Sequence, residues 1–459
     1  MRNFRGMRVL VLGGARQGVA LARFLAEKNA LVTLNDNRSA ENFSDLVIEL
    51  GALGIQTFFG SHPLTLLDEC DLVCISGGVP LDLPIVQEAQ KRGIPLSNDS
   101  QILFEGLKAK AIGITGSAGK TTTTTMVGEI AKKSVRDGQK AWIGGNIGVP
   151  LIPYLAEIGP RDVVILELSS FQLELMTISP AVATITNITP NHLDRHGTMQ
   201  AYTAAKAHIL DYQHPSDTAI LNREDAGAWD LRNKVRGKLI TFGLQEPKGD
   251  LAGTFLRENS LWIKDGVLEQ EICPNHSVRL RGTHNLLNAL AACATAHAAG
   301  FSKEAMQAGI EEVHGISHRL EFIRQWHGAD WYNDSIATTP ERTLAAIRSF
   351  HEPLVLLLGG RDKHLPWMDL AAEIHQRADH IILFGEAASL IYSALDSYEK
   401  HNFPYTLERT GTLPEAIQAA AKIVQEGDVV LLSPGGTSYD AFKDFEERGE
   451  LFRKLVEEL

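Results

Sequence analysis

The segment AIGITGSAGKTTTTTMVGEIAKK, residues 111–133, decides the fold of the central part of the chain. Its first five residues are mostly apolar and predict a buried strand, and the residues after Gly119 predict a helix. A glycine-rich loop joins them and is followed at once by Lys120 and Thr121. Amide groups of such a loop bind phosphate oxygens, the lysine neutralises the β and γ phosphates, and the threonine hydroxyl can bind Mg²⁺. The segment therefore predicts a P-loop that binds ATP.

This loop departs in one position from the common P-loop spacing GxxxxGK[ST]. The first glycine of that pattern would fall on Ile114, and the loop instead contains Gly116, so that the sequence is TGxxGKT. A purely structural turn does not require glycine, lysine and threonine in this order between a strand and a helix. We therefore keep the prediction of ATP binding.

The N-terminal segment MRVLVLGGARQGVALARFLAEKNALVTLNDN, residues 7–37, predicts a strand, a glycine-rich turn, an amphipathic helix and a second strand. Gly13, Gly14 and Gly18 approximate the GxGxxG pattern of dinucleotide-binding folds, and Asp36 follows at close to the expected ~20 residues. The same turn could bind any phosphate at the helix N-terminus, or it could be purely structural. The residues alone leave these alternatives open.

Polar residues also follow two apolar strands predicted downstream of the P-loop. Glu167 ends the strand in DVVILELSSFQLE, where a P-loop protein places an acidic metal ligand; the alternative is a carboxylate in solvent. His192 and His196 have helical i, i+4 spacing, but HLDRH lacks the glutamate of HExxH, which disfavours zinc. Lys206 lies in a predicted helix, where a single lysine is usually solvated.

The last third of the chain begins near His314 and alternates apolar strands with helical stretches, which predicts a further α/β sheet. Its turn WYNDSIATTPERT, residues 331–343, is polar except for Ile336 after the strand. We expect Thr339 to cap the next helix and Pro340 to begin it. Because ligands bind at strand ends in open α/β sheets, this turn is also a candidate site.

The composition fits a protein of several ordinary globular domains. At about 100 to 200 residues per domain, 459 residues correspond to two to four domains, and we expect three. The formal net charge of -12 disfavours nucleic acid as a main partner. Four cysteines without a CxxC pair predict a reducing compartment. We also find no signal-peptide core and no apolar stretch of about 18 residues that would cross a membrane.

Taken together, the motifs resemble the Mur ligase family. TGSAGKT, ELSSFQLE, NITPNHLD, AAK, HNLLNALAA, HRLE and NDS occur in the family's order and spacing, and the resemblance runs from Gly13 to Gly449. It implies an α/β fold of three domains: a Rossmann-like UDP-binding domain over residues 1–107, a central P-loop ATPase domain over 108–314, and a Rossmann-like amino-acid-binding domain over 315–459.

The resemblance is strongest to the family members that add D-glutamate to UDP-N-acetylmuramoyl-L-alanine in cytoplasmic peptidoglycan synthesis. Such ligases transfer a phosphoryl group from ATP to the substrate carboxylate, and the amino acid's amine then displaces phosphate to form an amide. The resemblance implies ADP and phosphate as products, two Mg²⁺ ions, small-molecule substrates, and a cytoplasmic monomer without nucleic-acid or membrane partners.

For the chemical step, the resemblance implies four catalytic residues, Lys120, Glu167, His192 and Lys206. Magnesium would be held by Thr121, Glu167, His192 and Lys206, the last as a carbamate, although Asn191 stands where many relatives carry Asp. ATP would contact Gly116, Ser117, Ala118, Gly119, Lys120, Thr121, Thr122, Asn285, Asn288, Arg319 and Asp334, with His318 beside them.

For the other two substrates, the resemblance replaces the dinucleotide with a UDP-sugar. The UDP-substrate would contact Ala15, Arg16, Asp36, Asn37, Arg38, Gly78, Asn146, Ser169 and Gln172. The amino acid would contact Thr338, Lys363, Ser438 and Phe445, with Ile336 next to them.

The turn around Ile336 is where the chain departs from these relatives. They typically read NDSKAT, whereas this chain reads NDSIAT, and SPGGTSYD replaces the usual SPACAS type. Losing a charge-assisted contact would cost about 1.5 to 3 kcal/mol if nothing compensated. The alternative within the family is therefore ligation of L-glutamate, which would need a separate epimerase. Alternatives from other classes are a nicotinamide-dependent oxidoreductase and a catalytically idle nucleotide-binding protein.

Overall fold

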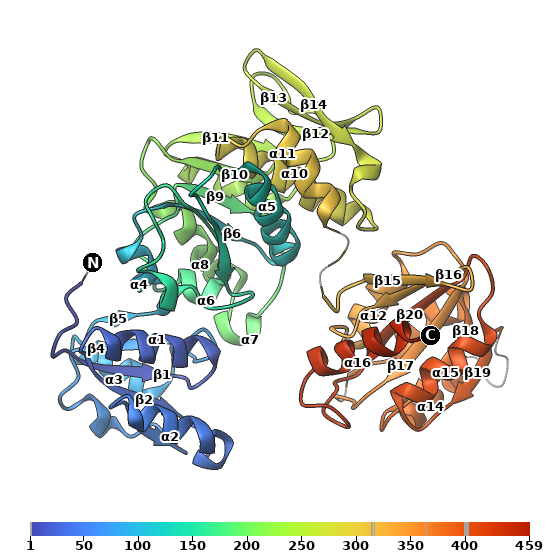
Figure 1. Cartoon of the computed structure of the whole chain (residues 1–459), viewed down its shortest axis with the longest axis horizontal. Coiled ribbons are helices and arrows are strands. Elements are labelled where there is room, and N and C mark those ends of the chain that lie inside the picture. The colour runs from blue at the N-terminus through green and yellow to red at the C-terminus, as the bar shows by residue number, and fades with distance from the viewer. Residues whose placement is uncertain (1, 314, 316, 364, 399–403) are drawn as a thin grey trace. The chain divides into compact units, whose positions relative to one another are not determined.

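The computed structural model (Figure 1) describes residues 2–313, 315, 317–363, 365–398 and 404–459. The chain divides into two compact units: unit 1 comprises residues 1–278 and 284–312, and unit 2 comprises residues 279–283 and 313–459. The predicted domain boundary after residue 107 lies inside unit 1, and the predicted boundary at His314 lies outside the described residues. Both boundaries stay predictions.

The first sheet of unit 1 has the strand order β3-β2-β1-β4-β5, and all its neighbouring strands are parallel. The glycine turn after β1 is tightly packed, because a Cβ on Gly18 would lie 1.9 Å from the carbonyl oxygen of Gly13. Only glycine fits this approach of helix to turn. The strands are β1 (Arg8–Leu12), β2 (Leu31–Asp36), β3 (Gln56–Phe59), β4 (Leu72–Ile75) and β5 (Leu96–Ser97), and the helices are α1 (Arg16–Glu27), α2 (Ser44–Ala52), α3 (Pro84–Lys91) and α4 (Asp99–Gly106).

The second sheet of unit 1 has the order β14-β13-β12-β11-β10-β9-β6-β8-β7 over the residues described. It is parallel from β7 to β12 and ends in an antiparallel meander of β12, β13 and β14. Its strands are β6 (Lys110–Thr115), β7 (Ala141–Gly145), β8 (Val163–Glu167), β9 (Val182–Ile185), β10 (Thr218–Asn222), β11 (Lys238–Phe242), β12 (Ala252–Arg257), β13 (Ser260–Asp265) and β14 (Leu268–Pro274).

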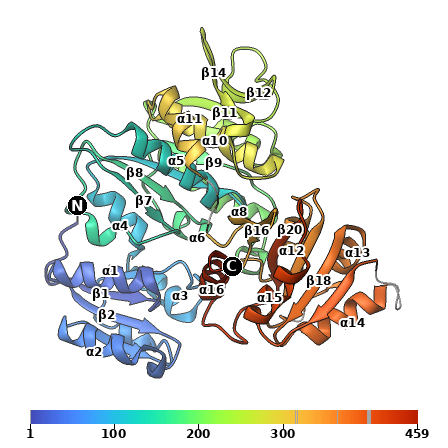
Figure 2. The same cartoon turned by 45° about the vertical axis from the view of Figure 1, so that its right-hand side comes forward.

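Helices on this sheet pack closely enough to require small residues. α11 lies beside α5 in both views of the chain (Figures 1 and 2), and a Cβ on Gly309 of α11 would lie 2.4 Å from the backbone nitrogen of Ile130 in α5. The helix α5, which follows the P-loop, is therefore packed against α11, the last helix of unit 1. The helices are α5 (Lys120–Ser134), α6 (Ser170–Leu173), α7 (Leu193–His196), α8 (Met199–Asp211), α9 (Ala226–Trp229), α10 (Thr283–Ala298) and α11 (Lys303–Glu312).

Unit 2 contains a sheet in the order β15-β16-β20-β17-β18-β19, parallel except for the antiparallel edge strand β15. Every residue of β17 is buried, as expected for a central strand covered on both faces. The strands are β15 (Glu321–Trp326), β16 (Ala329–Asn333), β17 (Leu354–Gly359), β18 (Ala378–Phe384), β19 (Thr406–Arg409) and β20 (Val429–Gly435), and the helices are α12 (Pro340–Ile347), α13 (Met368–Arg377), α14 (Ala388–Tyr398), α15 (Leu413–Ile423) and α16 (Phe445–Glu457).

Segment 279–283 belongs to unit 2 although both of its flanks belong to unit 1. Arg281 fixes it there: its guanidinium donates a hydrogen bond to the Tyr332 hydroxyl at 3.0 Å and pairs with Glu352. The same group lies over the rings of Tyr332 and Phe350, at 5.4 and 5.2 Å from their centroids. A cation held by a carboxylate and two aromatic faces is a firm attachment.

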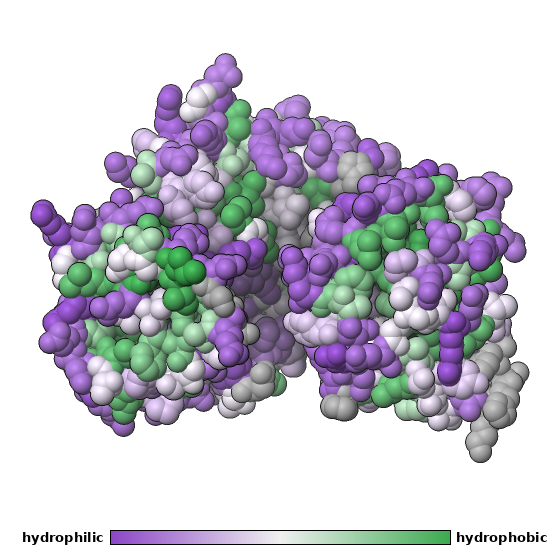
Figure 3. Space-filling view, turned by 60° about the horizontal axis from the view of Figure 1, so that its bottom comes forward, coloured by the Kyte–Doolittle hydropathy of each residue, from purple (hydrophilic) through white to green (hydrophobic). Residues whose placement is uncertain are grey.

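On the face shown in Figure 3, hydrophilic side chains are abundant and hydrophobic ones form separate patches. Exposed apolar side chains come from distant parts of the chain, among them Ile48, Val267 and Tyr439. Of the helices described, none is long and apolar enough to cross a membrane.

Candidate active site

The glycine-rich loop joins β6 to α5, as predicted. A Cβ on Gly116 would lie 1.8 Å from the Thr186 hydroxyl oxygen, and one on Gly119 would lie 2.2 Å from Oδ1 of Asn288. Gly119 also has a φ of +78°, which favours glycine. Position 114 is instead a fully buried strand residue, Ile114. This explains the departure from GxxxxGK[ST]: Gly116 and Gly119 lie where the side chains of Thr186 and Asn288 leave no space for a Cβ, whereas position 114 lies inside the strand.

The loop is braced by its own lysine and by the segment after β9. Lys120 Nζ donates hydrogen bonds to the carbonyl oxygens of Gly116 at 2.9 Å and Ser117 at 3.1 Å. Asn187 accepts the Ala118 N–H on Oδ1 at 2.8 Å and the Ser117 N–H on its carbonyl at 2.9 Å. The loop backbone is therefore preorganised, and the ammonium group of Lys120 lies directly against it.

Glu167 lies at the carboxyl end of β8, 2% exposed, and not in solvent as the alternative would require. Its Oε2 accepts a hydrogen bond from the Thr121 hydroxyl at 2.8 Å, and its Oε1 accepts one from Asn146 Nδ2 at 3.0 Å. Two predicted metal ligands are thus in contact, and a predicted UDP-substrate residue adjoins them. A hydroxyl and a carboxylate are hard oxygen donors, which suit Mg²⁺.

Lys206 is a buried residue of α8, only 1% exposed, so a solvated role is wrong. Its Nζ donates to the Gly116 carbonyl at 2.8 Å and lies 3.4 Å from the Thr115 hydroxyl. Burial is the main cause that lowers the pKa of this amine to about 6, and the charge of Lys120 is the second cause. The charge of Glu167 acts in the opposite direction. At neutral pH the amine is therefore largely uncharged and able to act as a nucleophile.

Aromatic and hydroxyl side chains surround this lysine. Tyr202, whose ring lies 4.7 Å from Lys206 Nζ, donates a hydrogen bond to the Ser117 hydroxyl of the loop at 3.0 Å. The His196 ring is stacked on Phe171 at 5.0 Å and lies 5.3 Å from the Tyr202 ring. His196 therefore belongs to a packed cluster and not to a zinc helix.

His192 has a left-handed backbone with φ of +52°, is exposed at the start of α7, and meets Phe171 edge-on at 5.4 Å. The described part of the chain contains no group of three His, Cys, Asp or Glu residues placed to hold a metal. Of the four predicted magnesium ligands, the structure brings Thr121 and Glu167 into contact, and the side chain of Lys206 reaches the P-loop from α8. His192 stays a predicted ligand.

The predicted adenine-side residues Asn285 and Asn288 are both 7% exposed on α10. Asn288 Nδ2 donates to Asn285 Oδ1 at 3.0 Å, which shows that the two amides share one helix face. Because Asn288 also meets Gly119, this face adjoins the phosphate loop. Thr122 of the loop set is buried in α5.

In the first sheet, Asp36 at the end of β2 organises the glycine turn. It accepts the Gly14 N–H at 2.7 Å and two side-chain hydrogen bonds from Arg38 at 2.8 and 2.9 Å. Burial would raise the pKa of Asp36, but these hydrogen bonds lower it to about 2. Three further residues predicted to contact the UDP-substrate are exposed near this turn: Ala15, Arg16 and Asn37.

Gln172, another residue of that set, is 1% exposed, and its amide is used inside the protein. Its Oε1 accepts from the backbone N–H and the hydroxyl of Ser169 at 3.0 and 2.9 Å, and its Nε2 donates to the Ser100 hydroxyl at 2.9 Å. Asn98 Nδ2 donates to the Gln172 carbonyl at 2.8 Å. Gln172 of α6 thus links the second part of unit 1 to Asn98 and Ser100 at the start of α4.

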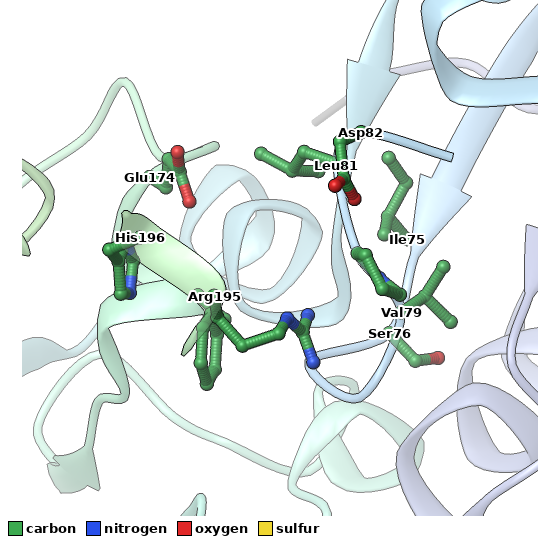
Figure 4. A pocket seen from close by; sticks show the side chains of 10 residues that line it. Ile75, Ser76, Val79, Leu81, Asp82, Glu174, Arg195 and His196 are labelled. Atoms are coloured by element: carbon green, nitrogen blue, oxygen red, sulfur yellow. The ribbon is translucent and has the colours of Figure 1, made fainter. Parts of the chain in front are cut away.

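A pocket of about 210 Å³ lies between the loop after β4 and helices α6 and α7 (Figure 4). Arg195 extends from α7 toward that loop and donates a hydrogen bond to the carbonyl of Gly78 at 3.2 Å. Glu174 and His196 line the pocket on the side of α6 and α7, and Asp82 on the side of the loop. The predicted UDP-substrate residue Gly78 therefore lies at this pocket's edge.

In unit 2, Asp334 follows β16 and is 4% exposed. It accepts hydrogen bonds from the Ser433 hydroxyl at 2.8 Å and the Leu320 N–H at 3.2 Å. Burial raises the pKa of Asp334 to about 7, although Ser433, Leu320, Arg319 and Arg342 lower it. The residue next to Arg319, His318, is also buried, with φ of +65°.

A fully buried arginine connects the elements of this edge. Arg448 of α16 donates to the hydroxyl and carbonyl of Ser335 at 2.9 and 2.8 Å, and to the Gly436 carbonyl at 3.2 Å. Ser335 in turn donates to the carbonyl of Phe445, the first residue of α16. The turn after β16, the loop after β20 and the start of α16 therefore form one rigid assembly.

The residues predicted to bind the amino-acid substrate lie around this assembly. Ile336 is half-buried, and its carbonyl accepts the Thr338 N–H at 2.8 Å and Arg342 Nη1 at 3.1 Å. Ser438 is buried after β20, and Lys363 is exposed after β17. Thr339 precedes α12 and Pro340 begins it, as predicted, but the Thr339 side chain makes no capping hydrogen bond.

Sequence reasoning did not single out several residues that the structure places at these sites. Asn187 braces the phosphate loop, Tyr202 contacts it, and Arg195 links α7 to the loop after β4 through Gly78. Asn187 begins the quoted motif NITPNHLD, Arg195 directly follows it, and Tyr202 lies shortly before the quoted motif AAK, so the neighbourhood of these motifs was the available signal. Arg448 had no such signal, because a charged residue on a helix is usually exposed.

Comparison with known families matches nearly the whole chain. Residues 7–98 match the MurD-like N-terminal domain of Mur ligases, residues 114–296 match the Mur ligase middle domain, and residues 318–436 match the glutamate ligase domain. The chain is also 37% identical over 464 residues to a UDP-N-acetylmuramoylalanine–D-glutamate ligase of Pelotomaculum thermopropionicum, covering 99% of this chain and 98% of that protein. The chain belongs to the Mur ligase family.

Other relatives agree with this assignment. A protein of the same name from Symbiobacterium thermophilum is 37% identical, with 98% of each chain covered. Among solved structures, UDP-N-acetylmuramate-alanine ligase MurC from Thermotoga maritima aligns with a TM-score of 0.60 at 21% identity, covering 98% of this chain and 99% of that one. That likeness supports the fold. The predicted three-domain α/β fold and Mur ligase family are confirmed, and an oxidoreductase is excluded as the interpretation of the first domain.

Proposed function

We propose that this Mur ligase joins D-glutamate to UDP-N-acetylmuramoyl-L-alanine in cytoplasmic peptidoglycan synthesis, consuming ATP and releasing ADP and phosphate. The observation that carries the proposal is identity of 37% along the whole chain with ligases of that name. The contact of Thr121 with Glu167 beside the P-loop supports it independently, because the proposed mechanism requires oxygen donors for Mg²⁺ next to that loop.

In this mechanism the loop amides and Lys120 bind the β and γ phosphates, and Thr121 and Glu167 would hold one Mg²⁺. Bound magnesium offsets the charge that builds up on the phosphoryl group as it passes to the substrate carboxylate. The Lys120 ammonium group donates hydrogen bonds to two loop carbonyls, and a change of its side-chain rotamer would let it bind a phosphate instead. The acyl phosphate then reacts with the amine of glutamate to give the amide.

We further propose that Lys206 acts as a carbamate, formed when its uncharged amine attacks CO₂ and loses a proton. The low pKa of this amine keeps it largely uncharged and makes the reaction feasible at neutral pH, and the negative charge of the carbamate would be attracted by Lys120. The carbamate oxygens and His192 would hold a second Mg²⁺. A Lys206→Ala variant should be inactive and regain activity with short-chain carboxylic acids.

We assign the amino acid to Thr338, Lys363, Ser438 and Phe445, and the UDP-sugar to the exposed residues after β1 and β2 together with Gly78 and Asn146. L-glutamate is the second candidate substrate, because the resemblance implies a lysine in this turn where the chain has Ile336. We expect the protein to act as a monomer, which light scattering would test.

The deciding experiment measures phosphate release from ATP with purified protein, UDP-N-acetylmuramoyl-L-alanine and either D- or L-glutamate. We expect release only when both substrates are present, with D-glutamate preferred. Equal release without an amino acid would contradict the ligase mechanism, and a preference for L-glutamate would establish the second candidate. Lys120→Ala is the control that should abolish release in every mixture.

A further inference from the structure

The carboxyl edge of the unit 2 sheet is formed by three adjacent parallel strands, β16, β20 and β17. The turn 334–339 follows β16, residues 436–440 follow β20, and residues 360–363 follow β17. Since parallel strands end at the same edge, these three loops lie side by side, with the β20 loop in the middle. An anionic ligand at this edge requires cations in the loops.

Two arginines of this edge are already committed to other groups. Arg448 is fully buried, and its guanidinium donates hydrogen bonds to Ser335 and Gly436. Arg361 forms a two-pronged pair with Glu386, with N–O distances of 2.8 and 2.9 Å. Neither has a free fork for a ligand.

Arg342 differs from both. It lies in α12, is exposed, and uses one nitrogen on the Ile336 carbonyl. Over the residues that the structure describes, its guanidinium has no carboxylate partner. An arginine fork with free N–H groups is the side chain best matched to a carboxylate, which it binds through two parallel hydrogen bonds.

The position of this guanidinium is fixed by the turn that carries the predicted amino-acid residues. The Ile336 carbonyl accepts both Arg342 Nη1 and the Thr338 N–H, so the guanidinium and the Thr338 backbone meet at one oxygen atom. The neighbouring carboxyl, Asp334, is buried and turned to Ser433 and Leu320. The remaining N–H groups of Arg342 therefore lie beside Thr338 without a hydrogen bond or ion pair to a carboxylate of the described residues, although the charge of Arg342 helps to lower the pKa of Asp334.

We propose that Arg342 binds a carboxylate of the incoming amino acid and so supplies, from the helix after the turn, the positive charge that Ile336 does not provide. This inference rests on the proposed function and names a specificity residue for it. Glutamate carries two carboxylates, and Lys363 in the β17 loop is an exposed cation that could bind the other.

The first test compares Michaelis constants. Arg342→Ala should raise KM for glutamate by about tenfold or more, the loss expected for one charge-assisted contact, while KM for ATP and for the UDP-substrate stays unchanged. The matched control is Arg348→Ala in the same turn-to-helix region, because Arg348 is exposed but paired with Glu373 at 2.7 Å. A KM for glutamate within twofold of wild type in Arg342→Ala would overturn the proposal.

A second pair of variants separates carboxylate binding from a mere clamp on the turn. Arg342→Gln keeps a donor for the Ile336 carbonyl but no charge, whereas Arg342→Lys keeps the charge. We expect lysine to recover most of the affinity for glutamate and glutamine to recover little, and Ile336→Lys to restore binding in the Arg342→Ala background. Equal recovery by glutamine and lysine would show a structural role and contradict the proposal.

The two proposals fail in distinguishable ways. Wild-type protein that forms no amide with either glutamate isomer would contradict the proposed function. Active wild-type protein whose KM for glutamate is insensitive to Arg342 and to added salt would contradict only the assignment of Arg342.

Discussion

Replacing Lys206 by methionine should stabilise the protein while abolishing its activity. The buried amine has a pKa of about 6, so that folding at neutral pH removes a proton from a group whose ordinary pKa is 10.5. Removing that proton at pH 7 costs about 1.36 kcal/mol for each pH unit below 10.5, or about 5 kcal/mol. Losing the hydrogen bond to the Gly116 carbonyl offsets about 1 kcal/mol of this. We expect a net gain of about 2 to 4 kcal/mol in the free energy of unfolding at pH 7.

The sign of the pH dependence follows from proton linkage. Between pH 6 and 10.5 the unfolded chain holds the lysine proton and the folded chain does not, so wild-type stability should rise with pH over this range. The advantage of Lys206→Met should therefore be largest near pH 6 and shrink toward pH 10. Urea unfolding of both proteins at pH 6.5, 8 and 9.5 in bicarbonate-free buffer measures it. A variant less stable than wild type at pH 6.5, or an advantage that does not change with pH, would refute the reasoning.

Three other predictions concern the sites. Gly119→Ala would force a Cβ to 2.2 Å from Asn288 Oδ1, so KM for ATP should rise more than about tenfold while Gly51→Ala, with open space around it, leaves KM unchanged. Glu167→Gln keeps a carbonyl oxygen for the Thr121 hydroxyl but loses the charge, so kcat should fall by about 100-fold or more, as a Mg²⁺ titration of initial rates would show. Asp334→Asn should reduce the pH dependence of the free energy of unfolding between pH 4 and 7, because a folded-state pKa of about 7 makes wild type lose stability as pH rises over this range. Urea midpoints that change with pH equally in wild type and variant would contradict this.

The sequence predicted the parts of the site that depend on local chemistry. The P-loop between β6 and α5, the strand-end position of Glu167 and the shared face of Asn285 and Asn288 are all local patterns of strand, turn and helix. The structure agrees with each of these placements. Their roles in catalysis and in binding ATP remain predictions.

Other features could not be predicted because they depend on contacts between distant segments. Gln172 stays a predicted contact of the UDP-substrate, but its hydrogen bond to Ser100, which lies 72 residues away, could not be predicted. Burial of Lys206 and Arg448 is equally non-local: helical position alone suggests a surface residue for each, and only the family resemblance assigned Lys206 to the site. The antiparallel meander from β12 to β14 also lacked a strong motif.

The attachment of segment 279–283 to unit 2 bears on whether the two units can be exchanged between members of the family. The chain passes from one unit to the other after residues 278, 283 and 312, so a single cut cannot separate them cleanly. A fragment that begins at residue 313 would lack Arg281 and leave Glu352 and the Tyr332 hydroxyl without their partner. A chimaera should therefore take residues 279–283 and unit 2 from the same parent, since natural recombination at residue 313 alone would combine an arginine with a surface that did not evolve with it.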